Sequence, residues 1–225
     1  MDSRPIQDAP AVLAPPEPGL QEANALWWRE DLSPRTLRRD ELHWTIWTVW
    51  IVSLLTAPGL LLLYLEPLTA PVAAICLAHA WLIPWLQARR GADQVTALSA
   101  AGSDAERVAI GLLGDLLAHS ERELLLETGL VMERGELGVW LLGASGALLV
   151  RSGDRRVDCW CVRVGDASDL PPADRAAHLL LGLREDELGF AKVANLSFSG
   201  ACWRIRRRLG RPSADALARA RALAR

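Results

Sequence analysis

The sequence has few of the residues and motifs from which enzyme active sites are usually recognised. Among 225 residues there are four cysteines, four histidines and a single lysine, Lys192. No segment has the pattern of a phosphate-binding loop, a dinucleotide-binding fingerprint or a serine nucleophile elbow. The nucleotide-dependent enzymes and the serine hydrolases that carry these motifs therefore receive no support from the sequence.

Charge is absent from two long stretches. Residues 42–65 contain no Asp, Glu, Lys or Arg over 24 positions, and residues 68–86 contain none over 19. A bilayer core of about 30 Å requires about 20 helical residues to cross it. The sequence therefore predicts a transmembrane hairpin over residues 42–87, with spans at about 42–65 and 68–87. The alternative is a pair of buried helices, but a soluble domain of this size rarely needs two charge-free helices of such length.

The residues that flank the two spans predict their orientation. Arginines precede the first span and follow the second, whereas the short turn has no cation, so both termini are expected in the cytoplasm. Tryptophans concentrate at the same two ends, as in an interfacial aromatic belt. The use of arginine in place of lysine is typical of bacterial coding, so we expect a multi-pass protein of the bacterial inner membrane. The predicted membrane-interface residues are Arg38, Arg39, Trp44, Trp47, Trp81, Trp85, Arg89 and Arg90.

The segments outside the hairpin differ in composition. Residues 1–24 are rich in proline and are predicted to be disordered. Residues 25–41 are predicted to form an interfacial helix, with Ser33 as an N-cap, or else to be poorly ordered. Residues 92–211 are predicted to form a cytoplasmic α+β domain, and residues 212–225 a basic C-terminal tail.

The soluble part shows the order helix, antiparallel meander, helix, strand. Its apolar periodicities predict a core on one face of a sheet. The fold class is therefore a membrane-anchored α+β protein, with a two-helix transmembrane hairpin followed by a cytoplasmic α–β-meander–α–β domain. The expected elements are a helix that begins at residues 103–104, strands at 130–133, 137–142, 147–151 and 157–164, a helix from about 171 to 188, and a last strand at 190–198.

The segment VDCWCVRV, residues 157–164, places two cysteines on either side of a tryptophan. In a strand, Cys159 and Cys161 would share one face, and Trp160 would lie on the other face, towards the core. Zinc sites usually need four nitrogen or sulfur ligands and wider gaps between paired cysteines, and Cys202 and the histidines are scattered. We therefore interpret the segment as a strand, in which Cys159 and Cys161 are only weak metal candidates. The sequence predicts no cofactor and no catalytic residue.

The order of the elements in the soluble part is similar to the core of restriction-endonuclease-like folds, which include nuclease-related domains attached to bacterial membranes. Those nucleases use an Asp and a Glu-x-Lys on adjacent strands to hold Mg²⁺ and position the attacking water. Asp158 matches the Asp, but no Glu-x-Lys follows it, and Lys192 comes after an alanine. The resemblance implies, as an alternative function, a nuclease-like hydrolase whose active site is missing or degenerate.

Positive charge is concentrated at the C-terminal end. Residues 190–225 contain nine Lys or Arg and one acid, Asp215, so this end carries +8 and the rest of the chain −10. The basic cluster is either a solvated tail or a contact for anionic lipid headgroups, to which each arginine contributes about 1 kcal/mol. We expect a membrane-anchored interaction or regulatory module, whose partners are the bilayer, anionic headgroups, another protein or a second copy, rather than nucleic acid. The residues of the cluster are Trp203, Arg204, Arg206, Arg207 and Arg208.

Overall fold

The computed structural model describes most of the chain from residue 32 onwards. The described residues are 20, 23, 26, 28–30, 32–99, 103–151, 153, 155–162 and 170–225. The predicted disordered leader at residues 1–24 therefore lies almost entirely outside the described residues, as do the last two positions of the strand predicted at 157–164.

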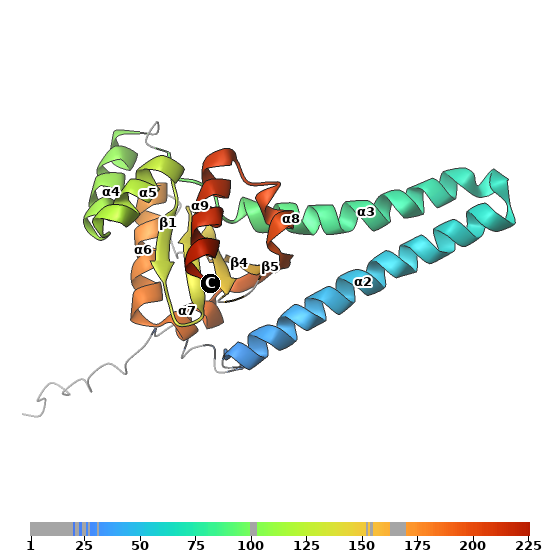
Figure 1. The fold of residues 1–225 in the computed structure, drawn as a ribbon, viewed down its shortest axis with the longest axis horizontal. Coiled ribbons are helices and arrows are strands. Elements are labelled where there is room, and N and C mark those ends of the chain that lie inside the picture. Colours follow the sequence, from blue (N-terminus) through green and yellow to red (C-terminus); the bar gives the residue numbers. More distant parts are fainter. Residues whose placement is uncertain are drawn as a thin grey trace, which may run out of the picture.

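Two long apolar helices, α2 (Pro34–Leu65) and α3 (Ala70–Asp93), form an antiparallel hairpin that projects from the rest of the molecule (Figure 1). The 3-10 helix η1 (Pro67–Thr69) makes the turn between them. The predicted N-cap is confirmed, because the Ser33 hydroxyl accepts a hydrogen bond from the Thr36 amide at 3.2 Å. The helix begins only at Pro34, and the described residues before it in the predicted interfacial segment are not helical.

The hairpin buries little of its own surface. Only 6% of an apolar 18-residue stretch of α2 and 11% of one in the segment Pro67–Asp93, formed by η1 and α3, are buried, and both helical segments are long and apolar enough to cross a membrane. The two helices approach closely at a small residue near the turn, where a Cβ on Gly59 would lie 3.1 Å from the Cβ of Cys76. They separate towards the domain (Figure 1).

The rest of the chain is built around a five-stranded antiparallel sheet whose strands follow in sequence order. The predicted meander is confirmed. The strands are β1 (Val131–Arg134), β2 (Gly138–Leu142), β3 (Gly146–Arg151), β4 (Arg156–Cys161) and β5 (Asn195–Ala201).

The last strand begins later than the sequence predicted. Residues 187–193 form a helix, α7 (Glu187–Val193), and β5 starts at Asn195 rather than at Phe190. The reason is a local cap: the Asp186 side chain accepts a hydrogen bond from the Gly189 amide at 2.8 Å. An apolar run this short suits a buried helix as well as a strand, so the capping residue decides between them.

The prediction of a core on one face of the sheet is wrong, because helices cover both faces. On β4, Trp160 belongs to one buried cluster and Cys159 to the other; we call these sides the tryptophan face and the cysteine face. The physical reason is visible in β2 and β3, whose successive residues are all buried, as in strands covered on both sides. The tryptophan face packs against α4 (Asp104–Asp115), α6 (Pro172–Glu185) and α7, and the cysteine face packs against α9 (Arg211–Leu223) and the end of α3.

The C-terminal segment expected as a basic tail is part of this core. In α9, Ala216, Leu217 and Ala220 are fully buried on the cysteine face. The remaining helices are α5 (His119–Thr128) and the short α8 (Cys202–Arg206), which follows β5 directly.

The two hairpin helices hold the sheet between them at the edge strand β5. Leu37 of α2 packs on the tryptophan face and Ala92 of α3 on the cysteine face. The Phe198 ring of β5 meets the Trp44 ring edge to face, with centroids 6.4 Å apart. A Cβ on Gly91 of α3 would lie 2.6 Å from the Phe198 Cβ, so only glycine allows this approach. The hairpin therefore belongs to the folded domain, and its helices cover an otherwise open sheet edge.

Candidate functional site

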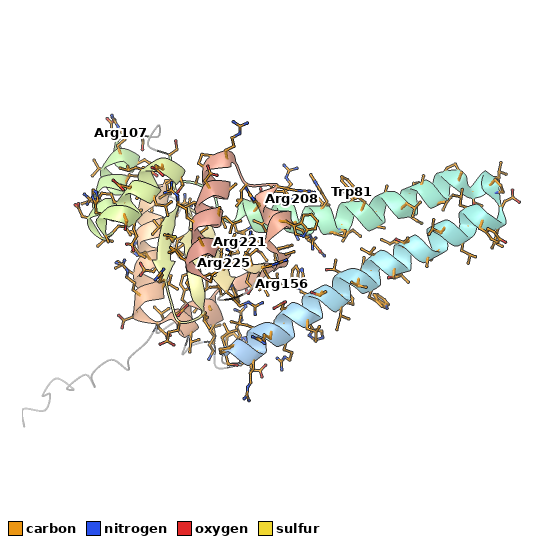
Figure 2. All side chains as sticks on the ribbon, in the orientation of Figure 1. Trp81, Arg107, Arg156, Arg208, Arg221 and Arg225 are labelled. Atoms are coloured by element: carbon orange, nitrogen blue, oxygen red, sulfur yellow. The ribbon has the colours of Figure 1, made fainter. Side chains whose placement is uncertain are left out.

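Arginines and tryptophans gather around a cavity where α3 meets α8. The cavity has a volume of about 420 Å³. Figure 2 labels two of its lining residues, Trp81 of α3 and Arg208, which follows α8. It unites residues that the sequence placed in two separate predicted sets, one at the membrane interface and one in the basic cluster. We call it the arginine–tryptophan cavity; it is lined by Trp81, Pro84, Trp85, Trp203, Arg204, Arg207 and Arg208.

The arginines of this cavity have different surroundings. Arg204 donates a hydrogen bond to the Pro84 carbonyl oxygen at 2.6 Å, and its guanidinium lies 5.1 Å from the centroid of the Phe198 ring. Arg204 therefore ties α8 to α3 and to the sheet. Arg207 lies over Trp203 on its own helix end, with 5.1 Å from guanidinium carbon to ring centroid.

Arg208 reaches across to the other helix. Its guanidinium lies 5.8 Å from the ring centroid of Trp85, and it donates a hydrogen bond to the carbonyl oxygen of Arg204. Its Nε atom is buried and has no hydrogen-bond partner among the described residues. Arg89 lies over the same Trp85 ring at 5.4 Å. Two cations therefore share one indole at this end of α3.

The cavity carries an excess of positive charge. In the part of the chain that the structure describes, no carboxylate lies within ion-pair distance of Arg204, Arg207 or Arg208, although Asp93 lies 4.0 Å from Arg89. Burial, and then repulsion from neighbouring arginines, lowers the pKa of Arg204 and of Arg208. Both arginines stay charged, because a guanidinium does not lose its proton in proteins. The geometry therefore suits an anionic group.

The fourth arginine of the predicted cluster lies outside the cavity. Arg206 is exposed and does not line it. It lies near the thiol of Cys202 on the cysteine face. Burial raises the pKa of the Cys202 thiol, and Arg221 and Arg206 only partly lower it again. The sequence treated the four arginines as equivalent, whereas the structure separates them.

The predicted interface tryptophans fall into two groups. Trp47 and Trp81 are 59% and 67% exposed and stack on Trp50 and Trp85, with ring centroids 5.5 and 6.1 Å apart. Trp44 differs, because its ring packs on β5. The contact of these residues with a membrane interface stays a prediction. The four predicted arginines, Arg38, Arg39, Arg89 and Arg90, are exposed.

A second charged cluster joins α2 to the sheet. Glu41 of α2 accepts a hydrogen bond from Arg151 of β3 and forms an ion pair with Arg156 of β4. The Nε atom of Arg151 lies 3.3 Å from the Asp158 carboxylate, and Arg156 also donates to the Thr45 hydroxyl at 2.6 Å. The side chains of Glu41, Arg151 and Asp158 are only 15%, 11% and 3% exposed. No local pattern marks this cluster, since its members come from three separate elements.

This cluster contains the residue matched to the metal-binding Asp of nucleases. Arg151 bridges Glu41 and Asp158, so its guanidinium occupies the place that a divalent cation would need. Burial raises the pKa of Asp158, although Arg151 partly opposes the shift. Lys192 lies on α7 rather than on a strand beside Asp158. The residues present do not fit a magnesium site, and the arrangement acts as a structural joint.

The two cysteines lie on β4, as the strand interpretation predicts. Cys159 is fully buried on the cysteine face, and Cys161 ends the strand partly exposed. Burial, and then the neighbouring Asp158 and Cys202, raise the pKa of the Cys159 thiol well above its ordinary value, so this thiol stays protonated. Among the described residues, no group of three or more His, Cys, Asp or Glu side chains is placed to hold a metal ion.

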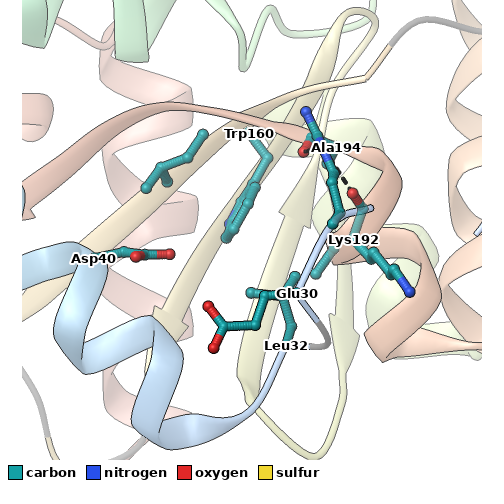
Figure 3. A pocket seen from close by; sticks show the side chains of 9 residues that line it. Glu30, Leu32, Asp40, Trp160, Lys192 and Ala194 are labelled. Carbon is teal, nitrogen blue, oxygen red and sulfur yellow. Dashed lines mark hydrogen bonds between the residues drawn. The ribbon is translucent and has the colours of Figure 1, made fainter. Parts of the chain in front are cut away.

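A smaller cavity, of about 260 Å³, lies beside Trp160 between the segment before α2 and α7 (Figure 3). Arg29 closes it by donating a hydrogen bond to the Lys192 carbonyl oxygen at 2.6 Å. The indole N–H of Trp160 is buried without a partner among the described residues. Glu30 and Asp40 offset Arg29 and Lys192 in the wall, so this cavity has no excess of either charge.

These features define an α+β protein whose antiparallel sheet is held at one edge by a hairpin of two long apolar helices. The arginine–tryptophan cavity lies at the junction of hairpin and domain. Comparison of the chain with protein-family models, with curated proteins and with solved structures finds no match in any of the three.

Proposed function

We propose that the protein is a membrane-anchored interaction or regulatory module of the bacterial inner membrane, in which α2 and α3 span the bilayer. The supporting observation is the exposed apolar surface of the hairpin. Trp50, Leu54, Leu61 and Ile75 are 54%, 55%, 56% and 58% exposed. Soluble monomers rarely expose apolar surface of this extent, because each Å² in water costs about 25 cal/mol. Lipid chains would cover it.

The arginines at the domain end of both helices favour a cytoplasmic location for the α+β domain. The contacts of Phe198 and Arg151 with the hairpin support a domain held at the bilayer surface in a fixed orientation. The arginine–tryptophan cavity then lies at the depth of the lipid headgroups, where indoles and arginines are favoured. Such a module would present its outer surfaces to a protein partner or to a second copy of itself.

The topology is tested by labelling engineered cysteines with a membrane-impermeant maleimide in bacterial cells that express the protein. Leu68→Cys at the turn, where Leu68 is 87% exposed, should react in intact cells. Leu126→Cys in α5, where Leu126 is 69% exposed, should react only after permeabilisation. The unsubstituted protein measures the background from its native cysteines. Labelling of Leu126→Cys in intact cells, or release of the chain from membranes by alkaline carbonate, would refute the proposal.

A further inference from the structure

We propose that the arginine–tryptophan cavity binds the phosphate group of one anionic glycerophospholipid, with Arg207 and Arg208 as its headgroup ligands. This inference rests on the proposed function, because it requires α3 to lie in a bilayer with the cavity at the bilayer surface. It differs from a general attraction of the basic cluster to anionic membranes, because it assigns each arginine a separate role.

The hydrogen bonds of the cavity separate the arginine that holds α8 in place from the two arginines that could bind a ligand. Arg204 is already committed to the Pro84 carbonyl oxygen and to the Phe198 ring, so it positions α8 and is not a free ligand. Arg207 is exposed over Trp203. Arg208 lines the cavity, and its buried Nε donor has no hydrogen-bond partner among the described residues. Two neighbouring guanidinium groups with free donors match the oxygens of one phosphate.

Charge supports the same assignment. Arg204 and Arg208 repel each other, and the described part of the chain supplies them with no carboxylate. A bound anion would relieve this repulsion in a partly desolvated site, where an ionic hydrogen bond is stronger than in water. The cavity beside Trp160 has as many acidic as basic side chains in its wall, so it does not favour a bound anion in this way.

The walls favour a lipid over a free phosphate ion. Trp81, Trp85 and Trp203 line the cavity, and a free phosphate has no apolar part to contact three indoles. Trp81 lies one helical turn closer to the hairpin tip than Trp85, so an acyl chain that follows α3 from the headgroup would pass it. The volume of about 420 Å³ also lies within the usual range of about 300–1,000 Å³ for ligand sites.

The experiment uses the full chain purified in a neutral detergent and native mass spectrometry with added lipid. Phosphatidylglycerol should bind with one molecule per chain, and phosphatidylcholine of the same acyl chains about tenfold more weakly. Arg207→Gln/Arg208→Gln should weaken phosphatidylglycerol binding about tenfold. The control Arg206→Gln, at the end of α8 directly before Arg207 but outside the cavity, should change it by less than about twofold.

A second pair of variants separates specific geometry from charge alone. Arg207→Lys/Arg208→Lys keeps the net charge but loses the forked donors, and should still bind phosphatidylglycerol several times more weakly than the unsubstituted chain. Circular dichroism should be unchanged and thermal unfolding little changed in both double variants, because among the described residues each arginine contacts one indole ring, and Arg208 also donates to the nearby Arg204 carbonyl oxygen.

Three results would overturn the inference. Equal weakening by Arg206→Gln would show diffuse attraction, and equal binding of phosphatidylcholine would show no recognition of net charge. Displacement of phosphatidylglycerol by low concentrations of inorganic phosphate would show a soluble ligand instead. The topology is judged separately by maleimide labelling, so loss of lipid binding in a chain with the expected topology overturns this inference and leaves the proposed function intact.

Discussion

Glu41 gives a direct measure of how firmly the hairpin is joined to the domain. In Glu41→Gln the side chain keeps its shape but loses its charge, so one of its two arginine partners, Arg151 or Arg156, must face an amide N–H. A hydrogen bond to a charged group contributes about 1.5–3 kcal/mol. Loss of a partner from a buried pair costs about 3–5 kcal/mol. Because Glu41 is still 15% exposed, we expect a loss in free energy of unfolding at the lower end of this range, about 3 kcal/mol.

Thermal unfolding of the full chain in detergent, followed by tryptophan fluorescence, measures this loss. For a chain of this size about 3 kcal/mol corresponds to a fall in Tm of about 6–12 °C. The matched control is Glu30→Gln, because Glu30, which precedes α2, pairs with Arg39 of α2 through side chains that are 62% and 60% exposed. An exposed pair contributes less than about 1 kcal/mol. If Glu41→Gln lowers Tm no more than Glu30→Gln does, the buried cluster does not join α2 to the sheet.

Two further predictions test the packing of α3 on β5 and the buried carboxylate Asp158. Gly91→Ala would place a Cβ 2.6 Å from that of Phe198 and should lower the free energy of unfolding by about 1–3 kcal/mol. Gly111→Ala, with no atom within 4 Å of the new Cβ, should raise it by about 0.5–1 kcal/mol, and the Tm of each variant measures the difference. Burial raises the native pKa of Asp158 above 3.8, so the folded chain holds this proton more tightly than the unfolded chain does, and this stabilisation falls as pH rises from about 4 through the native pKa. Tm measured against pH should show this fall in the unsubstituted chain and not in Asp158→Asn, and a constant difference between the two would contradict it.

Local patterns were sufficient for the elements that depend on local physics. The charge-free runs at residues 42–65 and 68–86 predicted the two long apolar helices, and Ser33 before a proline predicted where the first begins. The antiparallel meander followed from short apolar strands separated by glycine turns. Each of these signals lies within one element or at its end, where sequence spacing and structure coincide.

Two errors arose where a local pattern fits more than one tertiary context. Residues 190–193 were predicted as the start of a strand, but the Asp186 cap and burial against the tryptophan face make them part of helix α7. The apolar runs of β2 and β3 did not reveal that the sheet is covered on both faces, because a buried strand and a half-buried one differ in what packs on them.

The sequence by itself therefore determined the apolar hairpin, the order of the strands and the concentration of arginine near the C-terminus. Only the tertiary structure decided that Arg204 meets Pro84 across 120 positions and that Glu41 meets Arg151 across 110. These contacts arise because α2 and α3 pack on opposite faces of the sheet beside β5. Which distant side chains share a cavity is set by this packing, and no spacing along the chain encodes it.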